Sequence, residues 1–226
     1  MGAWEDELWD EARWEAYLRV QQSRMHRLLE DYFTFLRQHP YPERRTLEAV
    51  KRWRMQLQAF LRAQGWDEEA IQHVAQLRDA LFPGMPSEEK EEDEPIVLPE
   101  SAAYHALHAQ ATTLGEHILS WAYVLPGYVK DSTLVHFCAQ VLQIPWHLAQ
   151  GHLLGYERET LGGNIVCTRD ALAAANTALE LLAEMREAPY MQATLYFAFY
   201  EALYELRNAL ALHVVRLRAR FELGID

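Results

Sequence analysis

Apolar side chains recur at spacings of three and four residues through four long stretches that begin near residue 101. Such spacing puts them on one face of an α-helix, which completes a turn about every 3.6 residues. Short breaks containing Gly or Pro separate the stretches, as is typical of helices joined by tight loops. The pattern predicts an all-α fold with an up-and-down four-helix bundle over residues 101–226. The expected core includes Tyr104, Leu107, Leu114, Ile118, Leu134, Phe137, Val141, Ile144, Leu148, Val166, Leu182, Leu203, Leu206, Leu210 and Leu217.

Local signals predict where these helices begin and end. Ser101 is the expected N-cap of the first helix, and Asp131 or Ser132 that of the second. Gly162-Gly163 is the expected turn before a third helix that starts at Asn164. The last helix is expected over about residues 189–221.

Residues 1–83 show the same spacing over shorter lengths and predict a small helical N-terminal domain. Pro40 and Pro42 end its first helix, because proline disfavours the helical conformation in the residue before it. Gly65 is the expected C-cap of its second helix, and Asp67 the expected N-cap of its third. Residues 84–100 combine prolines with a run of acidic residues, which predicts a solvated linker between the two domains.

The formal net charge of −12 argues against broad contact with a phosphate backbone, which requires a positive surface. Positive charge is nevertheless in local excess between Arg13 and Arg62. With interleaved aromatic residues, this stretch could bind nucleic acid through phosphates and stacking. The alternative is a solvated helix face beside core aromatics. The candidate nucleic-acid-binding residues are Arg44, Arg45, Lys51, Arg52 and Arg54.

Neither Cys138 nor Cys167 has the spacing of a zinc site, and both are expected to be packed thiols. His105 and His108 lie one turn apart, but no Glu-x-x-His sequence accompanies them, so no metal or other cofactor is predicted. The acidic N-terminus does not resemble a signal peptide. No apolar run approaches the roughly 20 residues that span a bilayer. The expected location is cytoplasmic, with no membrane partner.

The last helix carries Arg207-Asn208 followed by His213. This arrangement resembles the signature of the HEPN ribonucleases, which are small helical-bundle enzymes. In such a site His213 would act as a general acid or base and Arg207 would stabilise phosphate charge, without a metal. Against this interpretation, helical geometry puts His213 in the apolar stripe of Leu206 and Leu210, where a histidine is expected to be a packing residue.

The same helix carries a second apolar stripe about 160° from the first on the helical wheel. A bundle helix in a monomer needs only one apolar face. We therefore predict that the second stripe is buried against another subunit or against the N-terminal domain. The area of the stripe favours a subunit, which predicts a homo-oligomer. The candidate interface residues are Phe197, Tyr204, Ala211 and Val215.

The run Gln143-Ile144-Pro145-Trp146-His147-Leu148-Ala149-Gln150-Gly151 resembles the Ser-Ile-Pro-Ser-Asn-Ile-Ala-Glu-Gly motif of the four-helix-bundle family encoded in 23S ribosomal RNA intervening sequences. Trp146 and His147 depart from that motif. The related Avd proteins of diversity-generating retroelements look similar over about residues 101–222. The resemblance implies oligomeric bundles, often pentamers, some of which bind nucleic acid or a reverse transcriptase, and it carries over no catalytic residue. Residues 32–36 and 45–53 have a weaker likeness to the DNA-clamping domain of tyrosine recombinases.

Together these patterns favour a non-catalytic, oligomeric helical scaffold or accessory protein. Its N-terminal domain would contact nucleic acid, a nucleic-acid enzyme or another protein partner. The alternative is a HEPN-type, metal-independent ribonuclease that uses Arg207 and His213.

Overall fold

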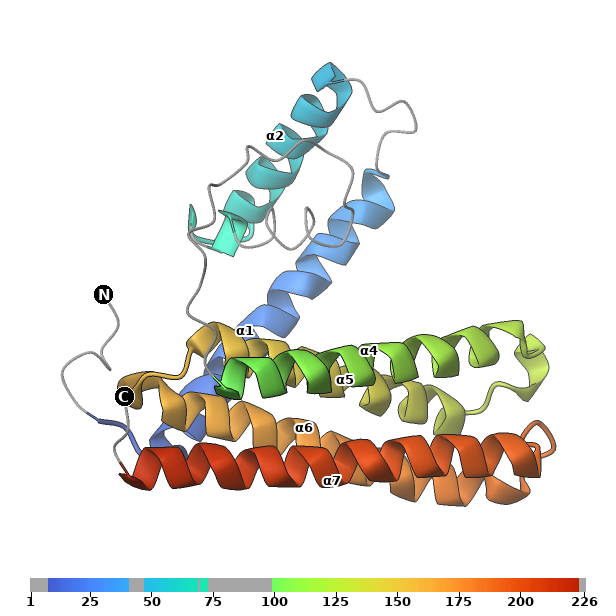
Figure 1. Ribbon diagram of the computed structural model, residues 1–226. Helices are drawn as coiled ribbons and strands as arrows, with labels where there is room; N and C mark the ends of the chain where they lie inside the picture. The colour runs from blue at the N-terminus through green and yellow to red at the C-terminus, as the bar shows by residue number, and fades with distance from the viewer. Residues whose placement is uncertain (1–7, 41–46, 69, 73–98, 224–226) are drawn as a thin grey trace. The chain divides into compact units, whose positions relative to one another are not determined.

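The computed structural model of the chain describes residues 8–40, 47–68, 70–72 and 99–223, which form helices and connecting turns with no strand among them (Figure 1). The all-α fold is confirmed. The helices are α1 (Glu11–Gln38), α2 (Leu47–Ala63), α4 (Pro99–Val124), α5 (Ser132–Leu154), α6 (Arg158–Glu184) and α7 (Ala193–Leu223), with short 3₁₀ helices η1 (Gly127–Val129) and η2 (Met185–Glu187).

Helices α4 to α7 pack around one apolar core, and each runs opposite to the one before it (Figure 1). Helices α5 and α7 each pack against both α4 and α6, so α5 and α7 occupy diagonal corners of the bundle. The predicted inward side chains lie in this core, except that Val166 is buried outside it, and Ile118, Phe137, Ile144, Leu203 and Leu206 are completely buried. The short connections between helices explain the antiparallel order.

Gly151 lies where α5 passes closest to α6. A Cβ atom at Gly151 would lie 2.8 Å from Asn164 Oδ1 and 3.2 Å from Cys167 Cβ, so only glycine fits. The buried Asn164 Nδ2 donates a hydrogen bond to the carbonyl oxygen of Gly155, 2.9 Å away. Thr168 Oγ1 donates to the Asn164 carbonyl at 2.9 Å. These bonds satisfy polar groups that would be costly to bury alone.

Gly162 and Gly163 lie inside α6, so the turn predicted at this pair is wrong. The chain turns at Gly155, whose φ of +102° suits glycine, and α6 starts at Arg158 instead of Asn164. The indole of Trp14 covers the glycine pair. Cβ atoms at Gly162 and Gly163 would approach Trp14 to 2.7 and 2.8 Å. Trp14 is completely buried.

The helix caps agree with the sequence in part. Asp131, and not Ser132, is the N-cap of α5, and its Oδ1 accepts the backbone N–H of Leu134 at 2.8 Å. This bond is the main cause that lowers the pKa of Asp131. Ser101 is not a cap, because α4 already begins at Pro99, where proline suits the first turn of a helix.

The described chain forms two compact units, one holding the residues up to Ala16 and from Pro99 onward, the other holding the residues from Tyr17 to Gln72. The first boundary falls within α1, whereas an N-terminal domain over residues 1–83 was expected. The start of α1 belongs with the bundle because Glu11 accepts two hydrogen bonds from Arg218, at 2.9 and 2.8 Å, and one from Arg169 at 3.0 Å. The Arg218 hydrogen bonds are the main cause that lowers the pKa of Glu11. Residues 84–98 of the predicted linker lie outside the described residues.

The second unit packs the remainder of α1 against α2 and the turn that follows it. Gly65, with a φ of +84°, ends α2 as predicted, and the N–H of Trp66 donates to the carbonyl of Leu61 at 3.1 Å. Asp67 is the predicted N-cap and accepts the N–H of Ala70 at 2.9 Å. The core of this unit contains Leu28, Phe35, Trp53, Leu57, Leu61, Trp66, Ala70 and Ile71.

The contact between Trp14 and the glycine pair gives a stability prediction. Replacing Gly162 with Ala should lower the free energy of unfolding by about 1–3 kcal/mol, because the added methyl group overpacks the indole. Gly115→Ala is the matched control, since its Cβ would meet nothing closer than 3.8 Å. In the middle of α4 that substitution should raise stability by about 0.5–1 kcal/mol. Urea denaturation measures the free energy of unfolding of each variant. Equal effects of the two substitutions would contradict the assigned packing.

Candidate interaction surface

The α4–α5 hairpin is almost free of charge. Helix α5 contains no Asp, Glu, Lys or Arg, although these residues make up 24% of the chain. Between Ser101 and Leu154 the charged residues are Glu116, Lys130 and Asp131. A solvated helix normally carries charge on its outer face, and depletion of charge is the composition typical of the centre of a protein interface.

Exposed apolar side chains form a row along the outer face of α5. Val135, Leu142, Trp146 and Leu153 are exposed at spacings of four and seven residues, which places them on one side of the helix. Their inward neighbours Phe137, Val141, Ile144 and Leu148 fill the core. Helix α5 therefore has two apolar faces, and only the inner one is covered by the bundle.

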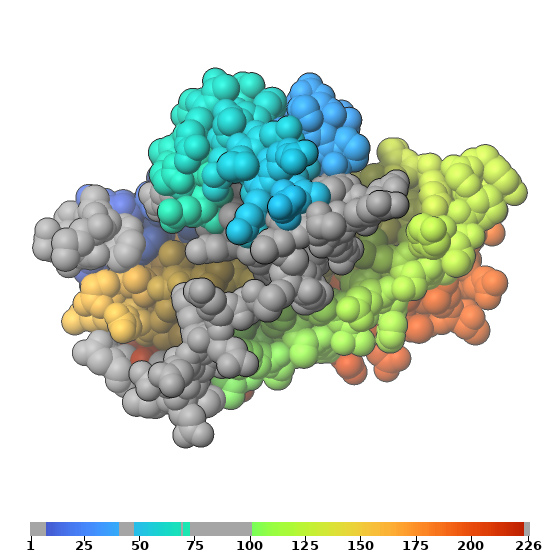
Figure 2. All heavy atoms as spheres, turned by 90° about the horizontal axis from the view of Figure 1, so that it is seen from above, coloured from blue at the N-terminus to red at the C-terminus, as the bar shows by residue number. Residues whose placement is uncertain are grey.

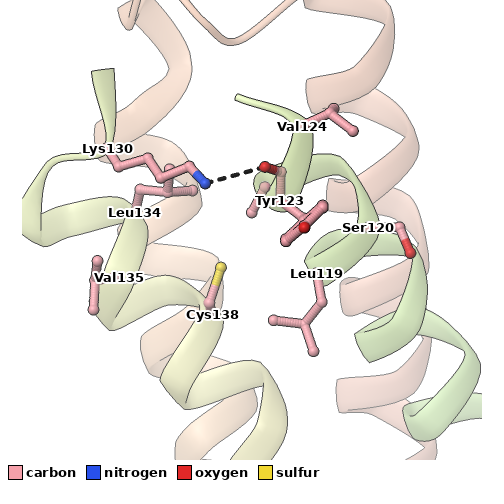
Figure 3. A pocket seen from close by; sticks show the side chains of 9 residues that line it. Leu119, Ser120, Tyr123, Val124, Lys130, Leu134, Val135 and Cys138 are labelled. Carbon is pink, nitrogen blue, oxygen red and sulfur yellow. Dashed lines mark hydrogen bonds between the residues drawn. The ribbon is translucent and has the colours of Figure 1, made fainter. Parts of the chain in front are cut away.

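A groove of about 740 Å³ lies between the end of α4 and the start of α5 (Figure 3). Its lining is apolar apart from Ser120 and Lys130, and the remaining residues are Leu119, Ala122, Tyr123, Val124, Leu134, Val135 and Cys138. Lys130 reaches across the groove, and its Nζ donates a hydrogen bond to the carbonyl oxygen of Tyr123 at 3.1 Å. Burial raises the pKa of the Cys138 thiol, so the group is neutral there.

The connection between α4 and α5 presents large side chains at the end of the bundle, and it is coloured yellow-green in Figure 2. Tyr123 is 83% exposed, and Val124 and Tyr128 are also largely exposed. Trp121 lies on the inner side of the same turns, and its ring contacts that of Phe199 at a centroid distance of 5.5 Å. The groove and the first half of α7 are therefore at the same end of the bundle.

The predicted interface residues on α7 lie on its outer side. Phe197 is 59% and Val215 62% exposed, Tyr204 is exposed, and Ala211 is partly exposed. Tyr204 stacks on Tyr200 at a centroid distance of 6.0 Å with an angle of 10° between the rings. The second apolar stripe thus exists and is not covered within the described chain. The sequence prediction placed the interface on α7 alone, and the signal for the α4–α5 face was the scarcity of charged residues between Ser101 and Leu154.

Arg207 and His213 do not form an open site. The side chain of His213 is buried in the bundle with an exposed fraction of 2%. Arg207 is half-buried, and its Nε donates to Asn176 Oδ1 at 3.0 Å and its Nη1 to Asn208 Oδ1 at 3.1 Å. A general acid or base must come within hydrogen-bond reach of its substrate, and the position of His213 does not allow this.

The basic candidates of the N-terminal part are only partly described. Lys51 and Arg52 are exposed on α2, and Arg54 is partly buried. Arg44 and Arg45 lie outside the described residues. Two arginines nearby are engaged in ion pairs, Arg62 with Glu68 at 2.9 Å and Arg24 with Asp67. Among the three candidates that the structure describes, Lys51 and Arg52 are thus the exposed ones.

Three histidines and two tyrosines meet where α4 begins and α5 ends. Tyr104 stacks on His152 at a centroid distance of 3.9 Å, and His105 contacts His152 at 5.4 Å. The Nδ1 of His152 shares a 3.0 Å hydrogen bond with the Tyr156 hydroxyl. Burial is the main cause that lowers the pKa of His108 and of His152, and the neighbouring histidines lower each further.

Two searches of the described residues concern metals and membranes. No group of three or more His, Cys, Asp or Glu is placed to hold a metal ion in the ranges that the structure covers. None of the helices described combines the length and apolar character needed to cross a bilayer.

Comparison of the chain with models of protein families, with curated proteins and with solved structures found no match. The likeness of Gln143–Gly151 to the intervening-sequence bundles stays a prediction. In this structure that run contains Gly151, which allows the close contact between α5 and α6.

The histidine cluster predicts a loss of stability on acidification. The pKa values of His108 and His152 are lower in the folded chain than the ordinary 6.5, so the unfolded chain takes up protons first as the pH falls. The contribution of these two histidines to the free energy of unfolding is complete above the ordinary pKa of 6.5, and it is lost as the pH falls through their folded pKa values. Urea denaturation at about pH 7.5 and about pH 5.5 should show this decline. A His108→Gln/His152→Gln variant should show a smaller one, and an unchanged decline would contradict the assignment.

The position of His213 predicts a structural effect when it is replaced. His213→Ala should lower the free energy of unfolding by about 1–3 kcal/mol, because it leaves a cavity in the core. Leu210→Ala, one turn earlier and also buried, is the matched control and should behave similarly. RNA cleavage in the presence of a chelator, lost in a folded His213→Ala protein but kept in Leu210→Ala, would instead support the ribonuclease alternative.

Proposed function

We propose that the protein is a non-catalytic helical scaffold that assembles into a homo-oligomer through the outer faces of its bundle. The observation that carries the proposal is the α4–α5 face, where exposed apolar side chains coincide with a scarcity of charge. Apolar patches of this kind are uncommon on monomers and mark sites of association.

Electrostatics supports copies of the same chain as the occupant of this face. The net charge of −12 makes two copies repel each other over most of their surface. The α4–α5 hairpin contributes almost nothing to that charge, so it is where two copies can approach at the lowest electrostatic cost. Tyr123, Tyr128 and Trp146 are also of the residue types enriched in interfaces.

Oligomerisation would present α2 in several copies. Lys51 and Arg52 by themselves offer few contacts to phosphate, and each exposed contact is weak. Several copies on one assembly would bind a polyanion such as RNA more tightly than one copy, through effective concentration. This is how an acidic protein with a small basic segment would serve as an accessory to a nucleic-acid enzyme.

Val135→Glu tests the proposal. Val135 is 62% exposed, so the substitution should leave the fold intact, but it would bury a charge in the interface. We expect the wild-type chain to sediment as an oligomer and the variant as a monomer with unchanged helicity. Ala173→Glu, at an exposed position on α6, is the control and should stay oligomeric. A wild-type chain that is monomeric at high micromolar concentration would rule the scaffold out.

A further inference from the structure

Two separate apolar faces are exposed on the bundle, and they lie on opposite sides of it. One is the α4–α5 face with its groove, and the other is the outer stripe of α7. Because α5 and α7 occupy diagonal corners, one flat contact cannot cover both faces of the same copy. A symmetric interface, in which the same face of two copies meets, would leave the other face exposed to water.

We propose that the interface is head-to-tail: the α4–α5 groove of one copy receives the outer stripe of α7 from the next copy. This inference rests on the proposed function and adds which surfaces meet. A contact of this kind covers both apolar faces with a single type of interface. Repeated from copy to copy, such a contact forms a ring where the rotation between copies closes and an open filament where it does not.

The charges of the two faces are complementary. Lys130 is the charged residue in the groove. In the first half of α7 the charged residues are Glu201, Glu205 and Arg207. Arg207 is bonded to Asn176 and Asn208, whereas Glu201 lies between Phe197 and Tyr204 on the outer stripe. Lys130 Nζ makes one hydrogen bond, to the Tyr123 carbonyl, and an ammonium group carries three donors. It can therefore bind a carboxylate of the next copy without losing its own contact.

The two faces also match in height along the bundle. The groove lies at the end of α4, and the Trp121–Phe199 ring contact puts the first half of α7 at the same level. Rotation about an axis parallel to the bundle preserves that level. Lys130 of one copy and Glu201 of the next would then lie at the same height, next to the tyrosine stack of Tyr196, Tyr200 and Tyr204.

Mixing two variants that cannot associate on their own tests the pairing. Val135→Glu disables the groove and keeps the α7 stripe, whereas Tyr204→Glu disables the stripe and keeps the groove. Each variant alone should be a monomer. Mixed in equal amounts they should form a 1:1 dimer, because one intact groove meets one intact stripe, and sedimentation measures this. Tyr123→Glu, at a position of the groove wall that is 83% exposed, serves as a second groove variant if Val135→Glu loses helicity.

A charge exchange gives an independent measurement. Lys130→Glu and Glu201→Lys should each weaken association by about 10-fold or more, and the double variant should recover most of that loss. If the wild type is oligomeric but the mixed variants stay monomeric, or if Val135→Glu still dimerises through α7, the head-to-tail pairing is overturned and the scaffold stands. A monomeric wild type overturns both.

Discussion

The close contact between α5 and α6 is the interaction on which the rest of the bundle depends. Gly151 removes the Cβ that would collide with Asn164, and Asn164 in turn bonds to the backbone at the end of α5. Because side chains in protein interiors are packed to the density of crystals, the spacing of this helix pair sets the room left for α4 and α7. The fully buried Ile118, Leu203 and Leu206 then fill that room.

The same principle extends to the start of the chain. The glycine pair in α6 leaves a flat surface that the indole of Trp14 covers, and Glu11 holds Arg169 and Arg218 on the two neighbouring helices. A partly buried carboxylate with two guanidinium partners is held more strongly than an exposed ion pair. The first turns of α1 are therefore part of the bundle, although more than eighty residues separate them from α4 in the sequence.

The distribution of charge, more than any single residue, bears on what the protein can do. Helices α6 and α7 carry acidic and basic residues, although α7 also bears an exposed apolar stripe, whereas the α4–α5 hairpin is almost free of charge. Burial of His213 and the bonds of Arg207 to Asn176 and Asn208 give both residues of the ribonuclease alternative a packing role. A catalytic pair would have required His213 to be exposed and the guanidinium of Arg207 to face solvent.

The sequence by itself determined the helical class, the four long helices of the bundle, most of their inward side chains and the caps at Gly65 and Asp67, and it limited the cap of α5 to Asp131 or Ser132. These follow from periodicity and from backbone preferences, which act over a few residues. Only the tertiary structure decided that Gly162-Gly163 continues a helix, because the reason is an indole some 150 residues away in the chain. It also decided that α1 is divided between two units and that the α5 and α7 faces lie on opposite sides, since both depend on which distant surfaces meet. Local patterns fix the conformation of a segment, but packing fixes its neighbours.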